Sequence, residues 1–532
     1  IIVLSDAINS TGAAEPDLID KLVYPNRAIL SPSAHVFPIR VVYQKHINSL
    51  MFIPSVFSHC SLYTSYNLTS IKMASQSTSG SSNTVDVVVI GAGLSGLRAA
   101  LGVQAAGLSY AVVEATDRVG GKTLTVPSKK SGPGVNDVGA AWINDTTQSE
   151  IYKLVQKYGL QVETQAIPGY DIFQSPEGSV LFKHGELPVS EEEKEALSQV
   201  LAHINELVSD VNLEDPGSGP NAKELDSVSI QEYCMQTFQS ELIADLFDTI
   251  IQSLIGVNGN EVSMLAFLLS LKAGNGFEAI TSDGKNGGQQ LRVRQGNQTI
   301  SKNMAAELKP GSIYLSSPVT EINQDSATGT CTVRAANNTT FHAKKVILSV
   351  ATPLYKNITF TPPLPEYKQL LASRNKLGYY SKIIFVFEKP FWRTAGLTGA
   401  IQSQTGPFTF TMDNSFPDDE QWSIACFTVG RRGREWSLLS QDERRHTAWE
   451  QLRSALENTN LPSGEKIQVP EPINVLEYEW SKQDFFHGGP EPGMPPGVIS
   501  QVGKGAVRKP FGGVHFVGTE TALQWKGYMR VR

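Results

Sequence analysis

The sequence has little cysteine and no long apolar run. Its four cysteines, Cys60, Cys234, Cys331 and Cys426, lie far apart, with no C-x-x-C and no cluster of cysteine and histidine. This spacing supports neither a disulfide framework nor a zinc site, so we expect free thiols, an intracellular location and no bound metal. No apolar stretch reaches the roughly 18 residues that a transmembrane helix needs, so none is predicted.

Positive charge is also in short supply. The 532 residues carry 45 Lys and Arg against 52 Asp and Glu, a net charge of -7. A chain with this balance offers no broad basic surface, so nucleic acid is not expected as a partner. The hydrophobic share of 40% is ordinary for a globular protein, and the length predicts two or three compact units rather than one core.

The first 72 residues show no motif, no clear periodicity and no signal-peptide pattern. Met73 follows, and then a Ser, Thr and Gly tract that is typical of a flexible leader. We therefore expect Met73 to be the native start and residues 1–83 to be a disordered or non-native extension. The alternative is a genuine but poorly ordered N-terminal extension.

The informative feature is a glycine motif directly after the apolar run at residues 85–90. In the segment G-A-G-L-S-G, Gly91 makes the turn, Gly93 lets the backbone approach a phosphate, and Gly96 lets helix and strand pack closely. Ser95 lies at the start of the helix that follows. A strand, a glycine turn and a helix in this order predict a pyrophosphate site.

The second strand of this unit, at residues 109–113, ends in Glu114, where a carboxylate would accept hydrogen bonds from ribose hydroxyls. The chain continues with Ala115, Arg118, Gly121 and Lys122, in a segment that resembles the E-A-x-x-R-x-G-G-R signature of the flavin-containing amine oxidases. Lysine replaces the last arginine, so a two-pronged contact becomes a point charge. The resemblance implies an α/β fold: a discontinuous Rossmann-like FAD-binding domain with an α+β substrate domain.

The segments between the motifs alternate between helical and strand patterns. A capping box at residues 190–193 predicts a helix to about residue 211, and further helices are expected at 230–254 and 262–272. Strands are expected at 313–319, 331–335 and 345–350. We predict an FAD-binding domain from residues 84–160, 282–371 and 476–529, and a substrate domain from 161–281 and 372–475.

A second signature lies near the C-terminus. An apolar strand ends in Gly518-Thr519-Glu520-Thr521, and Trp525-Lys526-Gly527-Tyr528-Met529 follows. In the amine oxidase family these segments lie along the flavin, and the tyrosine forms one wall of an aromatic cage that receives the amine. The resemblance therefore implies flavin contacts from Gly518, Glu520, Thr521 and Met529, and a catalytic role for Tyr528.

Lys382 lies in an otherwise apolar strand-like run, where a lysine is costly to bury without partners. In the family the lysine at this place, ten residues before the matching tryptophan, here Trp392, holds a water beside the flavin N5. The resemblance thus implies that Lys382 assists the reaction with oxygen. The alternative is an alternating strand with Lys382 on its solvent face.

Further site residues also come from the resemblance. Asp484 occupies the position where mammalian monoamine oxidases carry a flavin-linked cysteine, so FAD should be held non-covalently, and Phe485 next to it should form the second cage wall. Ala141, Trp142 and Trp480 are expected to contact the flavin. The backbone of Val319 should contact the adenine, with an ordinary strand edge as the alternative. The chain resembles fungal monoamine oxidases most closely.

This resemblance implies a FAD-dependent oxidase of primary amines, with secondary amines as a further class. Its products would be an imine or aldehyde and hydrogen peroxide, and its partners a small amine and O2; a homo-oligomer and a cytoplasmic or peroxisomal location are left open. An L-amino acid oxidase would need a cavity arginine, for which Arg292, Arg294 and Arg393 are candidates. A polyamine oxidase would need acidic cavity residues.

A rival from another class is a flavin-binding protein without turnover. After Met529 the family continues Glu-Gly-Ala into a helix that helps to hold the flavin, whereas this sequence reads Arg530-Val531-Arg532. Each charge-assisted hydrogen bond contributes about 1.5–3 kcal/mol, and about 1.4 kcal/mol is tenfold in affinity. We therefore expect the chain as given to bind FAD weakly.

Overall fold

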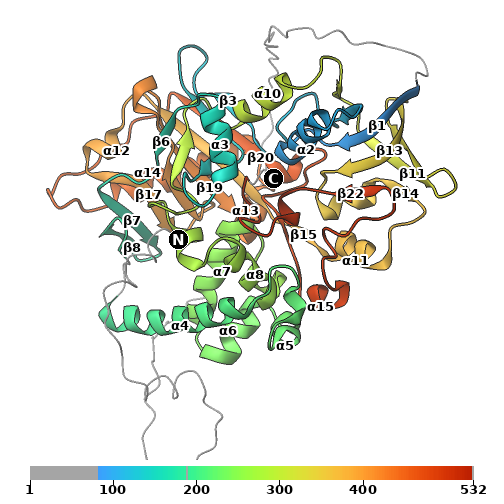
Figure 1. Cartoon of the computed structure of the whole chain (residues 1–532). Coiled ribbons are helices and arrows are strands. Elements are labelled where there is room, and N and C mark those ends of the chain that lie inside the picture. Colours follow the sequence, from blue (N-terminus) through green and yellow to red (C-terminus); the bar gives the residue numbers. More distant parts are fainter. Residues whose placement is uncertain (1–81, 187–189, 530–532) are drawn as a thin grey trace, which may run out of the picture.

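The computed structural model describes residues 82–186 and 190–529. The expectations for Met73, for Cys60, for the extension up to residue 81 and for Arg530–Arg532 lie outside these residues. The described part has the predicted mixed α/β architecture, in which two large sheets lie side by side and a group of helices lies at one end of them (Figure 1). The division into an FAD-binding and a substrate domain at the expected boundaries stays a prediction.

The first large sheet is built around β1 (Ser82–Ile90), which pairs in parallel with β2 (Tyr110–Val113) and β13 (Thr340–Leu348). Alternate β1 residues enter different cores: Val87 and Val89 pack with α2 (Leu94–Ala105), and Val88 and Ile90 pack on the opposite face. Burial on both faces explains the continuous apolar run at 85–90. The predicted strand, glycine turn, helix and second strand are confirmed.

The same sheet contains strands from distant parts of the chain. Its order is β10-β2-β1-β13-β12-β11-β14, with β22 (Val514–Phe516) parallel to β13. The strand expected at 313–319 is wrong as one piece: Ser316 has a positive φ of 49°, which separates β10 (Ile313–Tyr314) from β11 (Val319–Asp325). The remaining strands are β12 (Thr330–Ala335) and β14 (Thr359–Thr361).

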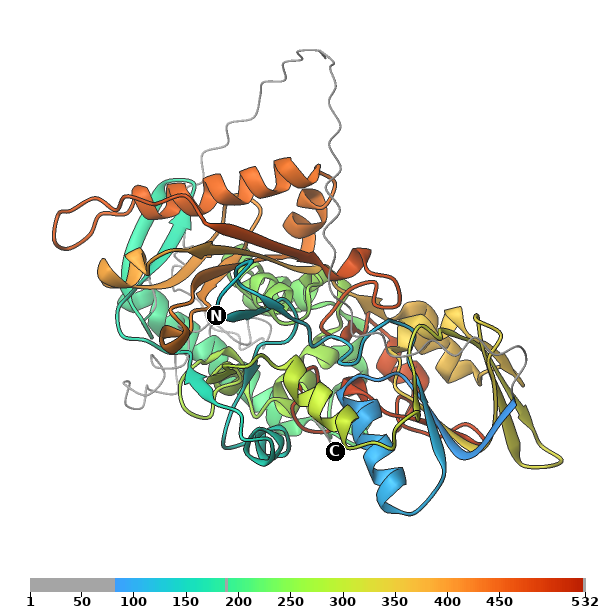
Figure 2. The same cartoon turned by 90° about the horizontal axis from the view of Figure 1, so that it is seen from above.

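The second large sheet has the order β20-β16-β19-β18-β17-β7-β8. One face is covered by α14 (Gln441–Glu457), whose Ala448 and Leu452 share a core with Phe385 of β16. Figure 2 shows this helix in orange along the sheet. The strands are β7 (Tyr170–Ser175), β8 (Gly178–Lys183), β16 (Tyr380–Phe387), β17 (Leu397–Ser403), β18 (Phe410–Asp413), β19 (Trp422–Val429) and β20 (Asn474–Glu479).

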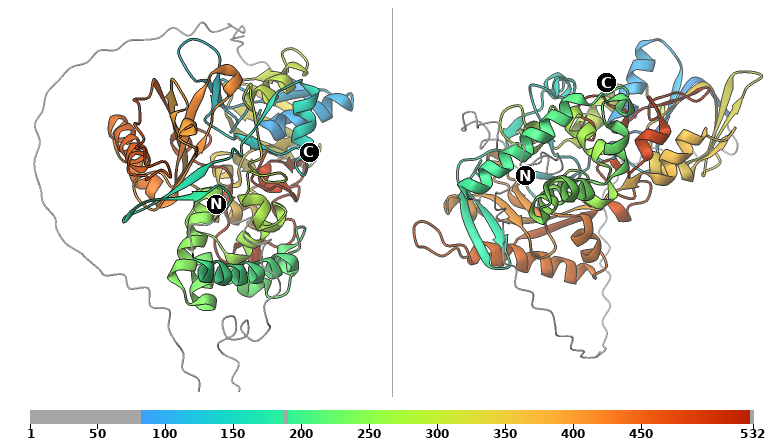
Figure 3. Two further views of the ribbon diagram at one scale, coloured as in Figure 1. Left: turned by 90° about the vertical axis from the view of Figure 1, so that its left-hand side faces the viewer. Right: turned by 90° about the horizontal axis from the view of Figure 1, so that it is seen from below.

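The helices between residues 190 and 281 gather at one end of the molecule (Figure 3). The predicted capping box is confirmed: Ser190 accepts a hydrogen bond from the Glu193 N–H at the start of α4 (Glu191–Asp210). The single helix expected at 230–254 is wrong, because Gln239 adopts a positive φ of 52° and Ser240 caps a new helix. The other helices here are α5 (Ala222–Ser227), α6 (Ile230–Phe238), α7 (Glu241–Ile255), α8 (Met264–Ala273) and α9 (Phe277–Thr281).

Short elements connect these parts. The small sheets pair β3 (Thr125–Pro127) with β4 (Val135–Asp137), β9 (Leu291–Val293) with both β5 (Trp142–Ile143) and β6 (Val162–Thr164), and β15 (Lys376–Leu377) with β21 (Pro492–Gly493). The other helices are α3 (Ser149–Lys157), α10 (Gln298–Ala306), α11 (Glu366–Arg374), α12 (Phe391–Thr394), α13 (Gly430–Trp436) and α15 (Val498–Val502).

Three cysteines, Cys234, Cys331 and Cys426, are buried free thiols. Across 82–186 and 190–529, no helix has both the length and the apolar character to cross a bilayer. Within the same ranges, no three histidine, cysteine or acidic side chains come together as a metal site would require.

A half-buried histidine joins the second sheet to the loop after α9. His184 Nδ1 lies 3.0 Å from an Asp171 carboxylate oxygen, and its Nε2 lies 3.3 Å from one of Asp283. Burial alone would lower the pKa of His184, but hydrogen bonds to the two aspartates raise it to about 10. The charged imidazole therefore links β7 to residue 283 over the neutral pH range.

We expect this link to stabilise the fold in a pH-dependent way. The folded-state pKa of His184 lies above its unfolded value of about 6.5, so its contribution is complete below pH 6.5 and is lost as pH rises through about 10. His184→Asn should remove roughly 1.5–3 kcal/mol near pH 6, measured by urea unfolding, and the deficit should shrink toward pH 10. A deficit independent of pH, or one equal to that of the exposed His342→Asn, would contradict the assignment.

Candidate active site

The glycine loop between β1 and α2 is fixed by close backbone contacts. Gly91 has a φ of +98°, and a Cβ there would lie 3.1 Å from the Ser349 carbonyl oxygen. A Cβ on Gly96 would lie 1.9 Å from the Gly91 carbonyl oxygen, so only glycine fits. Helix α2 begins after Gly93 without a side-chain cap. The backbone N–H groups of the first helical residues, which include Ser95, are therefore available to bind an anion.

Glu114 holds this loop from the end of β2. One carboxylate oxygen accepts the Ala92 N–H at 2.6 Å, and the other accepts the Thr116 N–H at 2.9 Å. The Ser317 N–H donates to the Glu114 carbonyl at 2.8 Å. This bond brings the segment that leads into Val319 to the same edge as Glu114 and Ala115. The predicted ribose contact, Glu114, and the segment of the predicted adenine contact, Val319, therefore lie at the same edge of the sheet.

The turn after Glu114 closes over the loop. Arg118 donates from Nη2 to the Gly121 carbonyl at 2.9 Å and from Nη1 to the Thr123 carbonyl at 3.3 Å, so its guanidinium shapes the turn. A Cβ on Gly121 would lie 3.1 Å from the Cα of Gly93. Two glycine segments therefore meet face to face beside an uncapped helix terminus, and this cradle fits a dinucleotide pyrophosphate.

Lys382 is buried in the second sheet, with 4% of its surface exposed. Its Nζ donates to the carbonyl of Asp137 at 3.0 Å and to that of Gly139 at 2.7 Å. The Trp142 and Phe427 rings lie 5.2 and 5.1 Å from it. Burial lowers the pKa of Lys382 to about 8. The alternative of a solvent-facing lysine is wrong, and one of its three N–H groups is left for another acceptor.

The segment that supplies these carbonyls is itself held by Asp137 and Asn297. The Asp137 carboxylate accepts the Asn297 N–H, and Asn297 Nδ2 donates to the carbonyls of Ala140 and Ala141, at 3.2 and 2.9 Å. Burial raises the pKa of Asp137 to about 6. Sequence reasoning missed both residues, although the D-V-G-A-A-W context places an acid four residues before the expected Ala141-Trp142 contact.

Trp480 faces the same segment from the end of β20. Its Nε1 donates to the Val138 carbonyl at 3.0 Å, and its ring centroid lies 4.7 Å from that of Tyr478. Tyr478 is the β20 partner of Lys382 on β16. Because side chains alternate along a strand, Tyr478 and Lys382 share one face, and Glu477 and Glu479 turn to the other.

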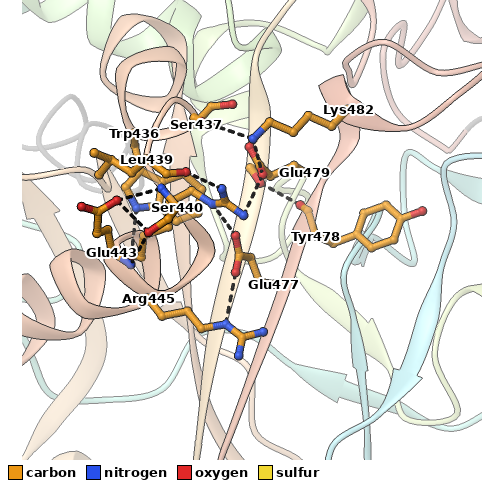
Figure 4. A network of polar contacts seen from close by, with 12 residues as sticks. Trp436, Ser437, Leu439, Ser440, Glu443, Arg445, Glu477, Tyr478, Glu479 and Lys482 are labelled. Atoms are coloured by element: carbon orange, nitrogen blue, oxygen red, sulfur yellow. Dashed lines mark hydrogen bonds and ion pairs between the residues drawn. The ribbon is translucent and has the colours of Figure 1, made fainter. Parts of the chain in front are cut away.

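The second face carries an ion-pair network (Figure 4). Arg444 of α14 lies 2.6 Å from Glu477 through Nε and 3.1 Å from Glu479 through Nη2. Lys482 Nζ lies 2.9 Å from the Glu479 carboxylate, and the Tyr379 hydroxyl donates to the same carboxylate at 2.7 Å. The network holds β20 in place. Tyr478 lies on the opposite face of this strand, and Trp480 follows its last residue.

The C-terminal signature lies against the glycine loop. The Glu520 carboxylate accepts the Thr352 N–H at 2.8 Å and its hydroxyl at 2.7 Å. Thr521 Oγ1 donates to the Gly518 carbonyl at 2.7 Å, and Met529 packs in the same core as Leu94 of α2. Predicted residues from the two ends of the chain therefore come together in one region.

Tyr528 is held on several sides. Its hydroxyl accepts a hydrogen bond from Gln289 Nε2 at 3.4 Å, and its ring lies edge-to-face with Trp525 at 4.9 Å. A Cβ on Gly288 would lie 2.9 Å from the Tyr528 ring, so the loop approaches it closely. Burial raises the pKa of Tyr528, which keeps the phenol neutral. The ring thus has one fixed orientation.

Phe485 is placed differently from the expectation of a closed cage. Its side chain is 44% exposed and its φ is +67°. Among residues 82–186 and 190–529, no ring contact joins Phe485 to Tyr528, so its role as a cage wall stays a prediction. The following residues reach the site instead: Lys122 Nζ donates to the Pro490 carbonyl at 2.9 Å, and Glu491 pairs with Lys526.

A glycine cradle on a Rossmann-type strand and helix, with a carboxylate at the end of the second strand, defines a dinucleotide-binding oxidoreductase. A family model for flavin containing amine oxidoreductases matches residues 94–530. The chain belongs to this family, so its cofactor is FAD and its reaction is the oxidation of amines.

Individual relatives agree with this assignment. The chain is 27% identical over 446 residues to a probable flavin-containing monoamine oxidase A of Dictyostelium discoideum, covering 84% of this chain and 94% of that protein. It is 31% identical to a flavin-containing amine oxidase of Danio rerio, covering 84% of this chain and 83% of that protein. The predicted family is confirmed.

Solved structures match as well. Putrescine oxidase bound to putrescine superposes with a TM-score of 0.76 at 26% identity, covering 84% of this chain and 96% of that one. Cyclohexylamine oxidase from Brevibacterium oxydans superposes with a TM-score of 0.75 at 29% identity, covering 84% and 95%. The predicted fold of the amine oxidase type is therefore confirmed.

Proposed function

We propose that this chain is a monoamine oxidase in which Lys382 serves the reaction with oxygen and Tyr528 orients the amine. The observation that carries the proposal is the buried Lys382 ammonium, which two carbonyls hold and which keeps one N–H donor. When bound, FAD would supply the redox chemistry, the two-electron oxidation of the amine to an imine coupled to reduction of O2 to hydrogen peroxide.

The cofactor would be held by the residues predicted from the sequence. The uncapped start of α2 supports pyrophosphate binding by the glycine loop, and the position of Glu114 beside that loop supports ribose binding. The proposed contacts are Gly91, Gly93, Ser95, Gly96, Glu114, Ala115, Arg118, Gly121, Lys122, Ala141, Trp142, Val319, Trp480, Gly518, Glu520, Thr521 and Met529.

Tyr528 would bind the amine by the face of its ring. An aromatic ring attracts a cation over its face by about 0.5–2 kcal/mol, and a fixed ring would orient the ammonium form of the amine at little entropic cost. The contacts of Tyr528 with Trp525 and Gln289 supply this rigidity. Phe485 stays the sequence-based candidate for the second wall.

The contacts of Arg294 and Arg393 favour an amine over an amino acid as substrate. Arg294 is bound by Asp418 and Asp419, and Arg393 by Asp413. Arg292 is buried against the Phe416 ring and donates to the Ser415 carbonyl. None of these contacts places a guanidinium beside Tyr528, but Arg292 Nε and Nη1 are buried without a hydrogen-bond partner among the described residues, so Arg292 stays the candidate for binding a substrate carboxylate.

The acidic residues favour a monoamine over a polyamine. Two carboxylates of this region, the buried Glu491 and the half-buried Glu520, already have partners. Glu491 pairs with Lys526 at 2.7 Å, and Glu520 accepts two hydrogen bonds from Thr352. A second substrate ammonium would have to displace one of these, which costs binding energy.

Matched substrates test the proposal. The purified holoenzyme should release peroxide with 2-phenylethylamine and hexylamine at a kcat/KM at least tenfold higher than with phenylalanine and 1,6-diaminohexane, a difference of about 1.4 kcal/mol. Acid precipitation should release the flavin, because Asp484 cannot form a thioether. Preference for phenylalanine would indicate an amino acid oxidase, preference for the diamine a polyamine oxidase, and bound flavin without peroxide a non-catalytic scaffold.

We also propose an intracellular location. The three described cysteines are reduced, and proteins that keep several free thiols are typical of reducing compartments. Fractionation of the native cell extract, with peroxide release as the readout, tests this placement.

A further inference from the structure

A buried ion pair lies directly beside the Tyr528 turn. Lys526 Nζ lies 2.7 Å from Glu491 Oε2, and the two side chains are 8% and 2% exposed. The two residues come from different parts of the site, since Glu491 precedes β21 and Lys526 belongs to the C-terminal signature. None of the roles proposed above for cofactor or amine uses this pair.

The pair is packed against the backbone that carries Tyr528. Gly527 has a φ of +85°, and a Cβ there would lie 3.0 Å from the Glu491 carboxyl carbon. The carboxylate therefore rests on the Cα between Lys526 and Tyr528. The residue before Glu491 is fixed as well, because the Pro490 carbonyl accepts the Lys122 Nζ–H at 2.9 Å.

The other contacts of Tyr528 do not involve the 489–491 segment. Its N–H donates to the Trp525 carbonyl at 3.1 Å, and its carbonyl accepts the Thr519 hydroxyl at 2.9 Å. The ring meets Trp525 and Gly288. Within the described part of the chain, the pair of Glu491 and Lys526 is the charged contact that ties the turn to the 489–491 segment.

We propose that Glu491 and Lys526 are positioning residues that act through Tyr528: their pairing sets the turn at Gly527 and so the ring that receives the amine. This inference rests on the proposed role of Tyr528. Removing one partner leaves an unpaired buried charge, which must find water or another ion by moving the turn. Removing both charges leaves no unpaired buried ion, which is the larger cost, so the turn can return toward its place.

A double-mutant cycle tests the proposal. Glu491→Gln and Lys526→Met should each raise the KM for 2-phenylethylamine tenfold or more, with kcat changed less than threefold. The combined Glu491→Gln, Lys526→Met variant should recover at least half of that loss on a logarithmic scale. Additive effects, or single effects on kcat alone, would overturn the pairing as a positioning device.

Two further arms separate positioning from general stability. In a Tyr528→Leu background, adding Lys526→Met should change KM by less than twofold, because the residue through which it acts is gone. The exposed pair Lys344 and Asp86, 2.8 Å apart with a lysine that is 76% exposed, is the matched control. Lys344→Met and Asp86→Asn should leave KM within twofold of wild type.

Hydrogen exchange tests the inference independently of turnover. The peptide that contains Trp525 to Met529 should exchange at least tenfold faster in each single variant and return toward the wild-type rate in the double variant. If the wild type oxidises no amine, the proposed function fails and exchange alone decides this inference. Unchanged exchange in both single variants would overturn it whatever the enzyme oxidises.

Discussion

Replacing Lys382 with methionine should slow peroxide formation about a hundredfold, because a buried, preoriented cation contributes on that order to stabilising developing negative charge. Two backbone carbonyls fix the Lys382 ammonium, and the surrounding rings keep bulk water away. Methionine has a similar length but carries no N–H donor. The loss should fall on kcat/KM for oxygen, measured with an oxygen electrode, and the KM for the amine should change little.

The pH dependence gives a second readout for Lys382. Burial lowers its pKa to about 8, so the ammonium is present below that pH and is lost above it. The wild-type kcat/KM for oxygen should therefore fall as pH rises through about 8, and this step should be absent from Lys382→Met. Lys345→Met, at an exposed β13 position, is the control. A kcat/KM for oxygen of Lys382→Met within threefold of the wild-type value would show that Lys382 does not serve the reaction with oxygen.

Arg444→Met should lower the free energy of unfolding by about 3–5 kcal/mol, the usual cost of leaving buried charges without a partner. The Arg444 and Glu477 side chains are only 11% and 3% exposed. Methionine fills the volume but leaves Glu477 and Glu479 without this guanidinium. Arg445 and Lys482 remain as their cationic partners, so the loss should lie toward the lower end of this range. Urea denaturation measures the loss.

A surface pair on the same helix provides the comparison. Arg453 and Glu450 lie 2.5 Å apart on α14, and each is 40% exposed. Exposed pairs contribute about 0–1 kcal/mol, so Arg453→Met should cost no more than that. Similar losses for Arg444→Met and Arg453→Met would show that burial of the network adds nothing.

The parts of the fold that were predictable depend on neighbouring residues. The apolar run at 85–90 and the glycines after it define β1, the turn and α2, and the Ser190 capping box defines the start of α4. The failures at Ser316 and Gln239 share a cause. Both adopt a positive φ without being glycine, a conformation that is uncommon for such residues and that the local sequence does not announce.

In the candidate site, too, some features could be predicted from the sequence and others could not. A lysine in an apolar strand indicates a buried, partnered group, and Lys382 is one. Its partners could not be predicted, because the carbonyls of Asp137 and Gly139 come from the end of β4 and the segment after it, and backbone atoms carry no sequence signal. Glu491 was missed for a related reason: its partner Lys526 is brought to it only by the folding of the C-terminal turn.

The burial of the three cysteines matters because the proposed reaction produces hydrogen peroxide. Hydrogen peroxide oxidises thiolates much faster than thiols, and it needs access to the sulfur. Burial raises the pKa of Cys234 to about 12, and it also raises those of Cys331 and Cys426. The sulfurs therefore stay protonated and enclosed. These three positions should withstand the oxidant that the enzyme itself generates over many turnovers.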